Sequence, residues 1–386
     1  MRIKFILMVA GLIILFGIGN YYIGLRLWQS IGTVVLPGLV SYYWIVFVIL
    51  AGSYFFGRIG AIYFPGDFSD WMIWSGSYWL GISFYLGLFW LAYDIITFLS
   101  SFFELLPSGL NFHLMGAGLS ILFTAILVVA YGAWNACTPH IRHYDVTINK
   151  QASGCAALHL VCISDLHLGL LVGRKGLRRA VNMINELNPD LVLMLGDIID
   201  ENIGAFVENE MPEILRGIRS HYGIYGILGS HEYIYGHSEK SLACLQRAGI
   251  KMLRDQYIKL PNDVYIVGRD DLFRAQLVGT PRQNLGTLLR GCNRELPIIL
   301  MDHQPVSLDD EALQGVDLQL SGHTHHGQIF PLNFLTQRLF EIDWGYLRKG
   351  AYQIIVSSGY GTWGPPIRVG TFSEIVDITI KFSPHV

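Results

Sequence analysis

The sequence predicts an α/β protein in two parts: an N-terminal helical transmembrane bundle of about four spans, then a four-layer α/β/β/α sandwich. Residues 1–135 contain only four of the 27 basic and four of the 30 acidic residues of the chain. After residue 139, short apolar runs typical of strands are interspersed with a segment whose apolar residues recur at helical spacing. Polar motifs follow several of the apolar runs. We therefore predict a transmembrane helical domain at 1–138 and a soluble domain at 139–386.

The transmembrane domain is predicted from four apolar stretches, each close to the roughly 20 residues that cross a bilayer. They are Phe5–Tyr22, Pro37–Phe56, Trp71–Leu99 and Leu114–Asn135. The first stretch also resembles a signal peptide, but no small-x-small cleavage site follows it, so we interpret it as a retained helix. The bilayer is thus an expected partner of this chain.

The orientation of the domain follows from the basic residues in the short flanks. With the N-terminus inside, five basic residues are cytoplasmic and only Arg26 is outside, which predicts a multi-pass protein of the inner (cytoplasmic) membrane with a cytoplasmic C-terminal domain. If one stretch fails to span, the domain changes sides.

Asp94 lies inside the third predicted stretch. An acid at such a position either marks a functional pathway, or lies near a helix end and faces a neighbouring helix or water. We favour the second interpretation.

The soluble domain is predicted to contain one clear helix and many strands. Residues 174–187 carry apolar side chains at 177, 181, 184 and 187, which is a helical stripe. The later strands follow one another with little helix between them, which favours two packed sheets covered by helices. The expected strands are Tyr144–Asn149, Leu158–Ile163, Leu191–Leu195, Gly223–Leu228, Val264–Val267, Ile298–Met301, Val316–Leu320, Ile354–Ser357 and Ile375–Ile380.

Composition excludes some classes of protein. The net charge of −3 gives no support for a nucleic-acid partner, which usually requires a basic patch. The five cysteines form no CxxC pair, so neither a disulfide framework nor a thiolate metal site is expected.

Five motifs after the apolar third carry residues able to bind metal. They are Asp165-Leu166-His167, Gly196-Asp197, Gly229-Ser230-His231-Glu232, His303 and Gly322-His323-Thr324-His325. Each follows an apolar strand, and carboxylates with imidazoles suit a pair of divalent metals. In an extended chain, positions i and i+2 point to one side, so Asp165 and His167 are expected to face one metal, and His323 and His325 to behave alike. Gly196 would allow close backbone approach.

The order of these motifs resembles the calcineurin-like metallophosphoesterases, over about residues 145–382. The tail from Val356 to Arg368 resembles the membrane-linked bacterial YkuE-type branch. This resemblance implies a hydrolase with two divalent metal ions and a calcineurin-like metallophosphoesterase domain at 139–386. It also implies a first metal held by Asp165, His167, Asp197 and His325, and a second held by Asp197, Ser230, His303 and His323. His231 matches the catalytic histidine that faces the phosphoryl group.

The chain departs from this family at Ser230, where the family has asparagine. A serine hydroxyl is shorter and a poorer donor to a metal, so the second site is expected to be weak, selective or lost. His326, where the family usually has glycine, is interpreted as a surface residue. Arg368 is a candidate substrate contact, since guanidinium binds oxyanions bidentately. Asp200, Glu201 and Glu232 are interpreted as solvated or as supporting residues, and Asp270 and Asp271 as candidates for the mouth of the site. Mn is the preferred metal, with Fe or Zn as alternatives.

The substrate class is predicted from apolar residues that follow the last motif: Ile329–Leu335, Leu339, Phe340 and Trp344. Beside a metal site in a membrane-tethered domain, they could enter the lipid interface or hold an acyl chain. We therefore expect a phosphorylated, lipid-linked substrate. The resembling branch includes cleavage of UDP-2,3-diacylglucosamine to UMP and lipid X. The alternatives are another phospholipid or polyprenyl phosphate, a soluble phosphodiester, or a sensor or scaffold with a degraded site.

Overall fold

The computed structural model describes residues 2–103 and 114–383, without the side chains of residues 2–9 and 12. The described chain divides into a helical unit of residues 1–133 with 364–367, and a second unit of residues 134–363 with 368–386. The predicted domain boundary at 138/139 stays a prediction. Each unit is described by itself.

The helical unit contains long apolar helices. They are α1 (Arg2–Leu27), α3 (Val40–Tyr63), α4 (Asp67–Phe102) and α5 (Leu114–Ala136), with a π-turn at Trp28–Gly32 and a short α2 (Thr33–Val35) after α1. Among the described residues, α3, α4 and α5 are long and apolar enough to cross a membrane. This confirms three of the predicted stretches as helices of that kind. The stretch Phe5–Tyr22 lies within α1, some of whose side chains are outside the described residues, so its role as a span stays a prediction.

Small and polar residues hold the helices together. A side chain at Gly76 of α4 would collide with the backbone of Tyr54 in α3, so the two helices meet at this glycine. Asp94 of α4 forms an ion pair with Arg26 of α1 and accepts a hydrogen bond from the Tyr22 hydroxyl at 2.6 Å. Asp94 thus faces a neighbouring helix, as the favoured interpretation expected.

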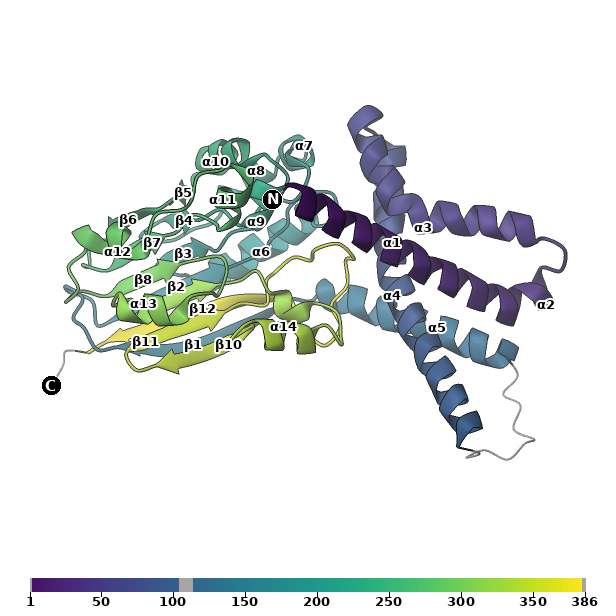
Figure 1. The fold of residues 1–386 in the computed structure, drawn as a ribbon. Coiled ribbons are helices and arrows are strands. Elements are labelled where there is room, and N and C mark those ends of the chain that lie inside the picture. Colours follow the sequence, from purple (N-terminus) through teal and green to yellow (C-terminus); the bar gives the residue numbers. More distant parts are fainter. Residues whose placement is uncertain (1, 104–113, 384–386) are drawn as a thin grey trace. The chain divides into compact units, whose positions relative to one another are not determined.

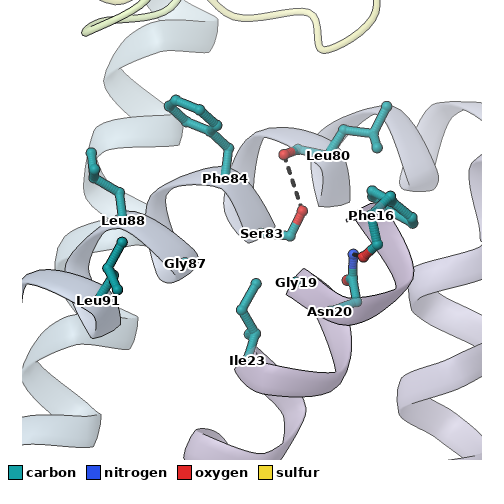
Figure 2. Close-up of a pocket in the computed structure, with 10 residues that line it drawn as sticks. All are labelled: Phe16, Gly19, Asn20, Ile23, Leu80, Ser83, Phe84, Gly87, Leu88 and Leu91. Atoms are coloured by element: carbon teal, nitrogen blue, oxygen red, sulfur yellow. Dashed lines mark hydrogen bonds between the residues drawn. The ribbon is translucent and has the colours of Figure 1, made fainter. Parts of the chain in front are cut away.

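A cavity of about 420 Å³ lies between α1 and α4 (Figure 2). Its lining is mostly apolar, with Phe16 and Ile23 from α1 and Phe84 from α4. The Ser83 hydroxyl donates to the Leu80 carbonyl at 3.1 Å, so this polar group is satisfied within its own helix. The cavity therefore offers little that would recognise a phosphate.

The second unit contains two six-stranded sheets (Figure 1). The first has the order β1-β12-β2-β3-β4-β5, and the second β10-β11-β9-β8-β7-β6. The strands of the first are β1 (His140–Ile148), β2 (Ala157–Ile163), β3 (Leu191–Met194), β4 (Ile224–Gly226), β5 (Lys251–Met252) and β12 (Glu374–Phe382). Those of the second are β6 (Gln256–Lys259), β7 (Tyr265–Gly268), β8 (Ile298–Met301), β9 (Leu318–Ser321), β10 (Gly345–Lys349) and β11 (Tyr352–Val356).

Helices cover the outer faces of both sheets. On the first sheet lie α6 (Arg174–Glu186), α7 (Ile203–Glu208), α8 (Met211–Leu215), α9 (Ser230–Ile234), α10 (Ser238–Arg247) and the adjoining α11 (Phe273–Leu277). On the second lie α12 (Leu285–Leu288) and α13 (Leu308–Leu313). The helix α14 (Asn333–Leu339) lies at one end of the sandwich (Figure 1).

Three apolar cores separate these layers. One packs α6 and its neighbours on the first sheet, the second fills the space between the sheets, and the third packs α12 and α13 on the second sheet. The four-layer α/β/β/α prediction is confirmed. Every strand expected from an apolar run is present, and α6 buries Leu177, Val181 and Ile184 as its stripe predicted. The short strands β5, β6 and β10 were not predicted, because each is short and carries polar residues.

Candidate metal centre

The motif residues meet because they follow the carboxyl ends of parallel strands. The strands β2, β3 and β4 are parallel neighbours in the first sheet, and β7, β8 and β9 in the second. Asp165, Asp197 and Ser230 come after β2, β3 and β4, whereas His303 and His323 come after β8 and β9. Parallel strand ends lie at one edge of a sheet, and here the same edges of both sheets supply the site.

The first cluster contains Asp165, His167 and His325. One ligand atom from each lies within 4.8 Å of the other two, and all three residues are buried. The His325 Nε2 atom lies 3.5 Å from Asp165 Oδ1 and 3.1 Å from His167 Nε2. Burial, His167 and Arg368 together hold the pKa of His325 well below its usual value, so its ring is neutral and suited to binding a cation.

The second cluster contains Asp197, His303 and His323, with ligand atoms again within 4.8 Å of one another. The His303 Nδ1 atom lies 2.7 Å from the Leu195 carbonyl, and Nε2 lies 3.1 Å from Asp197 Oδ2. Burial lowers the pKa of His323 to about 3, so this imidazole is neutral as well. Asp197 lies beside both histidines of this cluster. It also lies near His231, whose ring contacts His167 of the first cluster.

These contacts fit divalent metals, because imidazole nitrogens and carboxylate oxygens converge in each cluster. If the proton of His303 lies on Nδ1, which donates to Leu195, then its Nε2 lone pair points at the Asp197 carboxylate. Burial lowers the pKa of His303, but Asp197 outweighs it and raises the pKa well above its usual value, so this nitrogen can hold either a proton or, in its place, a metal cation. A ring N–H given to a carbonyl is also the usual support of a histidine that binds metal. In the first cluster, two imidazole nitrogens face each other at 3.1 Å.

The backbone at the site is left-handed rather than extended, which corrects the expected i, i+2 geometry. The φ angles are 52° at Asp165, 46° at His167, 48° at Asp197, 72° at His323 and 49° at His325. Non-glycine residues rarely adopt this region, and those that do are found in turns and cluster at active sites. The turns still bring Asp165 and His167 together, but they separate His323 and His325 into different clusters.

Gly196 lies where two loops meet the second cluster. Its φ is 92°, and a Cβ atom at this position would lie 2.8 Å from His303 Nδ1 and 2.9 Å from the Gly229 backbone. A side chain would therefore displace either the histidine or the loop that begins α9. The expected close backbone approach is found here.

The structure places Ser230 beside the second cluster. Its hydroxyl is buried and lies 3.3 Å from Asp197 Oδ2, to which it donates a hydrogen bond. A hydroxyl used in this way holds the Asp197 carboxylate in place. Its role as a ligand stays a prediction.

His231 lies between the clusters and is oriented by Asp200. The His231 Nδ1 atom is 3.4 Å from Asp200 Oδ1, and its Nε2 is 4.0 Å from Asp197 Oδ2. Burial lowers the pKa of His231, but Asp197 and Asp200 outweigh it and raise the pKa to about 9. Burial raises the pKa of Asp200, but the neighbouring His167 and His231 rings, at 3.6 and 3.4 Å, outweigh it and hold the pKa below its usual value. His231 is therefore protonated at neutral pH and able to donate from Nε2.

Glu232 joins the loops that carry Asp197 and His231. Its buried carboxylate accepts hydrogen bonds from the backbone N–H groups of Ile198 at 2.8 Å, Ile199 at 3.0 Å and Gly229 at 2.8 Å. Glu232 is thus a supporting residue, one of the two interpretations open from sequence. Asp200 had the same two interpretations from sequence, solvated or supporting. The sequence signal that could have identified it as supporting is its position three residues after Asp197, at the same strand end.

Arg368 lies behind His325, and this placement does not support the predicted contact with substrate. The side chain is fully buried, and its Nη2 donates to the carbonyls of Ser358 at 2.7 Å, Gly359 at 3.0 Å and Gly361 at 2.6 Å. The same atom lies 3.3 Å from His325 Nδ1. A guanidinium used by three carbonyls positions the loop around His325 and has no face left for a phosphate.

The two acids considered for the mouth of the site are both buried. Asp270 accepts hydrogen bonds from Arg254 at 2.6 Å and Arg274 at 2.9 Å. Burial raises the pKa of Asp271 to about 6, and its carboxylate accepts from Gln304, the residue after His303. Both therefore belong to the packing behind the second cluster.

Comparison with known proteins identifies the same part of the chain. A family model described as calcineurin-like phosphoesterase matches residues 158–327. A zebrafish (Danio rerio) transmembrane protein with metallophosphoesterase domain is 34% identical over 276 residues, covering 68% of this chain and 62% of the relative. An Aquifex aeolicus metallophosphoesterase is 31% identical, covering 67% of this chain and 98% of the relative. The Bacillus subtilis metallophosphoesterase YkuE is 31% identical, covering 65% and 90%. The match thus spans less than two thirds of the zebrafish relative.

Proposed function

Because this chain belongs to the calcineurin-like metallophosphoesterase family, we propose that it is a membrane-anchored phosphohydrolase that uses two divalent metals to cleave a phosphoester or pyrophosphate. The observation that carries the proposal is the pair of buried clusters, in which the Nε2 atoms of His167 and His325 lie 3.1 Å apart and the Nε2 atom of His303 lies 3.1 Å from Asp197 Oδ2. Imidazole nitrogens and carboxylate oxygens that converge in this way suit two divalent cations.

In this proposal, Asp165, His167, Asp197 and His325 hold the first metal, and Asp197, Ser230, His303 and His323 the second. When bound, the metals supply an activated water and neutralise phosphoryl charge. The residues of the chain do the rest. His231 donates its Nε2 proton to the leaving oxygen, Asp200 orients the His231 ring, and Glu232 keeps the two loops in register.

The finer proposal concerns the metal and the substrate. We assign Mn²⁺ first, with Fe or Zn as alternatives, because oxygen and imidazole ligands accept all three. We assign a lipid-linked phosphoester or pyrophosphate as substrate, with UDP-2,3-diacylglucosamine, cleaved to UMP and lipid X, as the specific candidate. Three helices able to cross a membrane support this choice, since such an anchor keeps the domain beside lipid substrates.

The proposed location is the inner membrane, with the catalytic unit on the cytoplasmic side. This orientation requires α1 to be a fourth crossing, and it rests on the excess of basic residues in the flanks predicted to be inside. A nucleotide-linked lipid made in the cytoplasm would be accessible to a domain placed there.

The experiment is UMP release from UDP-2,3-diacylglucosamine by the purified full chain with and without Mn²⁺, beside hydrolysis of soluble bis(p-nitrophenyl) phosphate. We expect Mn²⁺-dependent hydrolysis that falls at least a hundredfold in His231→Ala, since general acid catalysis contributes about 10²–10⁴-fold. Hydrolysis of the soluble diester alone would retain the phosphohydrolase and remove the lipid substrate. Metal-independent hydrolysis, or none of either substrate, would refute the proposal.

A second candidate is a sensor or scaffold with a degraded site, and one observation favours it. The Ser230 hydroxyl donates to Asp197, whereas the family asparagine would offer an oxygen to the second metal. Ser230→Asn distinguishes the two functions. Activity that appears only in the variant indicates a degraded enzyme, whereas activity already present in the parent excludes the sensor.

A further inference from the structure

The apolar segment after the last metal motif divides into a buried and an exposed part. Ile329 and Ile342 are buried, but five residues on and around α14 face outward. The exposed fractions are 44% at Phe330, 38% at Leu332, 61% at Phe334, 55% at Leu335 and 67% at Leu339. We refer to these five side chains as the α14 patch. A contiguous apolar surface of this kind marks an interaction site.

The α14 patch is fastened to the loop that carries His325. Asp343 is the centre of this attachment, because its carboxylate accepts from the Thr336 hydroxyl of α14 at 2.6 Å and from His326 Nδ1 at 2.8 Å. Its carbonyl accepts from the Thr324 hydroxyl at 2.5 Å. Thr324 and His326 are the two neighbours of His325. His326, expected at the surface, is therefore half-buried and holds α14 in a fixed position beside the first cluster.

Aromatic side chains continue the apolar surface up to the metal residues. The Phe340 ring, directly after α14, lies 6.2 Å from the His323 ring in an edge-on arrangement. On the other side, Trp363 is 55% exposed and its ring lies 5.9 Å from that of His231. Apolar side chains thus lie next to residues of the second cluster and next to the proposed acid.

We propose that the α14 patch inserts into the lipid surface and holds the metal centre at the level of the phosphate groups. This inference rests on the proposed function. The occupant is lipid because the chain itself carries three helices able to cross a membrane. In addition, the sequence of α14, NFLTQRL, has no acid and one exposed arginine, Arg338, which suits an anionic headgroup region.

The first test measures depth in the membrane without any activity. The full chain is reconstituted in vesicles of phosphatidylethanolamine and phosphatidylglycerol, with Cys137 and Cys155 replaced by serine. A spin label is attached at Leu335→Cys, or at Leu313→Cys as a matched control, since Leu313 on α13 is 84% exposed. We expect the label at 335 to be relaxed by oxygen and protected from a water-soluble nickel complex, and the label at 313 to show the reverse.

Two results of this test would overturn the inference. A label at 335 that the nickel complex reaches as readily as the label at 313 would mean that the patch faces water. A label at 335 shielded from both relaxing agents would mean that protein covers the patch, either the helical unit or a second copy of the chain.

The second test compares hydrolysis of a substrate embedded in the membrane with hydrolysis of a soluble substrate. In the double variant Phe334→Asp/Leu335→Asp, we expect hydrolysis of a lipid phosphate in vesicles to fall at least tenfold. Hydrolysis of soluble bis(p-nitrophenyl) phosphate should stay within twofold of the parent, and Leu313→Asp should leave both unchanged. Equal loss on both substrates would assign the patch to folding and refute insertion. A parent inactive on both would refute the proposed function, while the spin-label result would still decide the position of α14.

Discussion

Replacing Glu232 with glutamine changes one carboxylate oxygen into an NH₂ group at the buried junction of two catalytic loops. One oxygen, Oε1, accepts from Ile198 and Ile199, and the other, Oε2, accepts from Gly229. The amide oxygen of glutamine can keep the first two bonds. Its NH₂ group then faces the Gly229 N–H, so two donors oppose each other.

The cost follows from these three bonds. Two charge-assisted bonds become neutral and the third is lost, which together costs about 2–4 kcal/mol. Burial and the nearby Asp197 raise the pKa of Glu232, so the charge itself is disfavoured in the fold and its removal offsets part of this cost. The net loss is about 1–3 kcal/mol. In a domain of this size, it lowers the melting temperature by roughly 3–10 °C.

The assay is thermal unfolding of the full chain followed by intrinsic fluorescence, with a parallel titration of Mn²⁺. The loops joined by Glu232 carry Asp197 and His231, so Mn²⁺ affinity should also fall about 10–100-fold, as it does when residues supporting metal ligands are changed. Glu295→Gln, at an exposed position, is the matched control. A Glu232→Gln variant that melts within 1 °C of the parent and binds Mn²⁺ equally would refute the reasoning.

Three further predictions concern other residues. Asp200→Asn removes the charge that orients His231, so turnover should fall about 10–100-fold with little change in KM, and Glu201→Gln should not reproduce this in steady-state kinetics. Burial raises the pKa of Glu311 from 4.5 to about 7, so the stability it contributes is present at low pH and is lost as pH rises through 7. Urea unfolding at pH 5 and 8 should show that Glu311→Gln removes up to about 3 kcal/mol of this pH dependence, and an unchanged slope would contradict it. Removing metal with a chelator should lower the melting temperature, because metal at a hundredfold excess over Kd contributes about 2.7 kcal/mol per site. Equal melting with and without Mn²⁺ would argue against bound metal.

The sequence alone was sufficient for the arrangement of the fold and for the residues that gather at the site. Apolar runs of four or more residues bury both faces of a central strand, so β3 and β8 and most of β2 were visible as patterns. Polar residues directly after such strands must lie at the sheet edge, which is why the five motifs could be grouped before any coordinates were known. The long apolar stretches Pro37–Phe56, Trp71–Leu99 and Leu114–Asn135 were visible for the same reason, since burial in a bilayer restricts composition.

The family resemblance implied which residues belong to each metal, but only the tertiary structure decided the backbone geometry of that division and what supports each residue. His323 and His325 are two residues apart, yet left-handed backbone turns send them to different clusters, and no spacing rule for an extended chain predicts this. Glu232 and Arg368 are ordinary charged residues in sequence. Their functions depend on distant groups that folding brings to them: the N–H groups of Ile198 and Ile199 for Glu232, and the His325 ring for Arg368. Directional hydrogen bonds between distant segments leave no periodic trace in a sequence, whereas burial does.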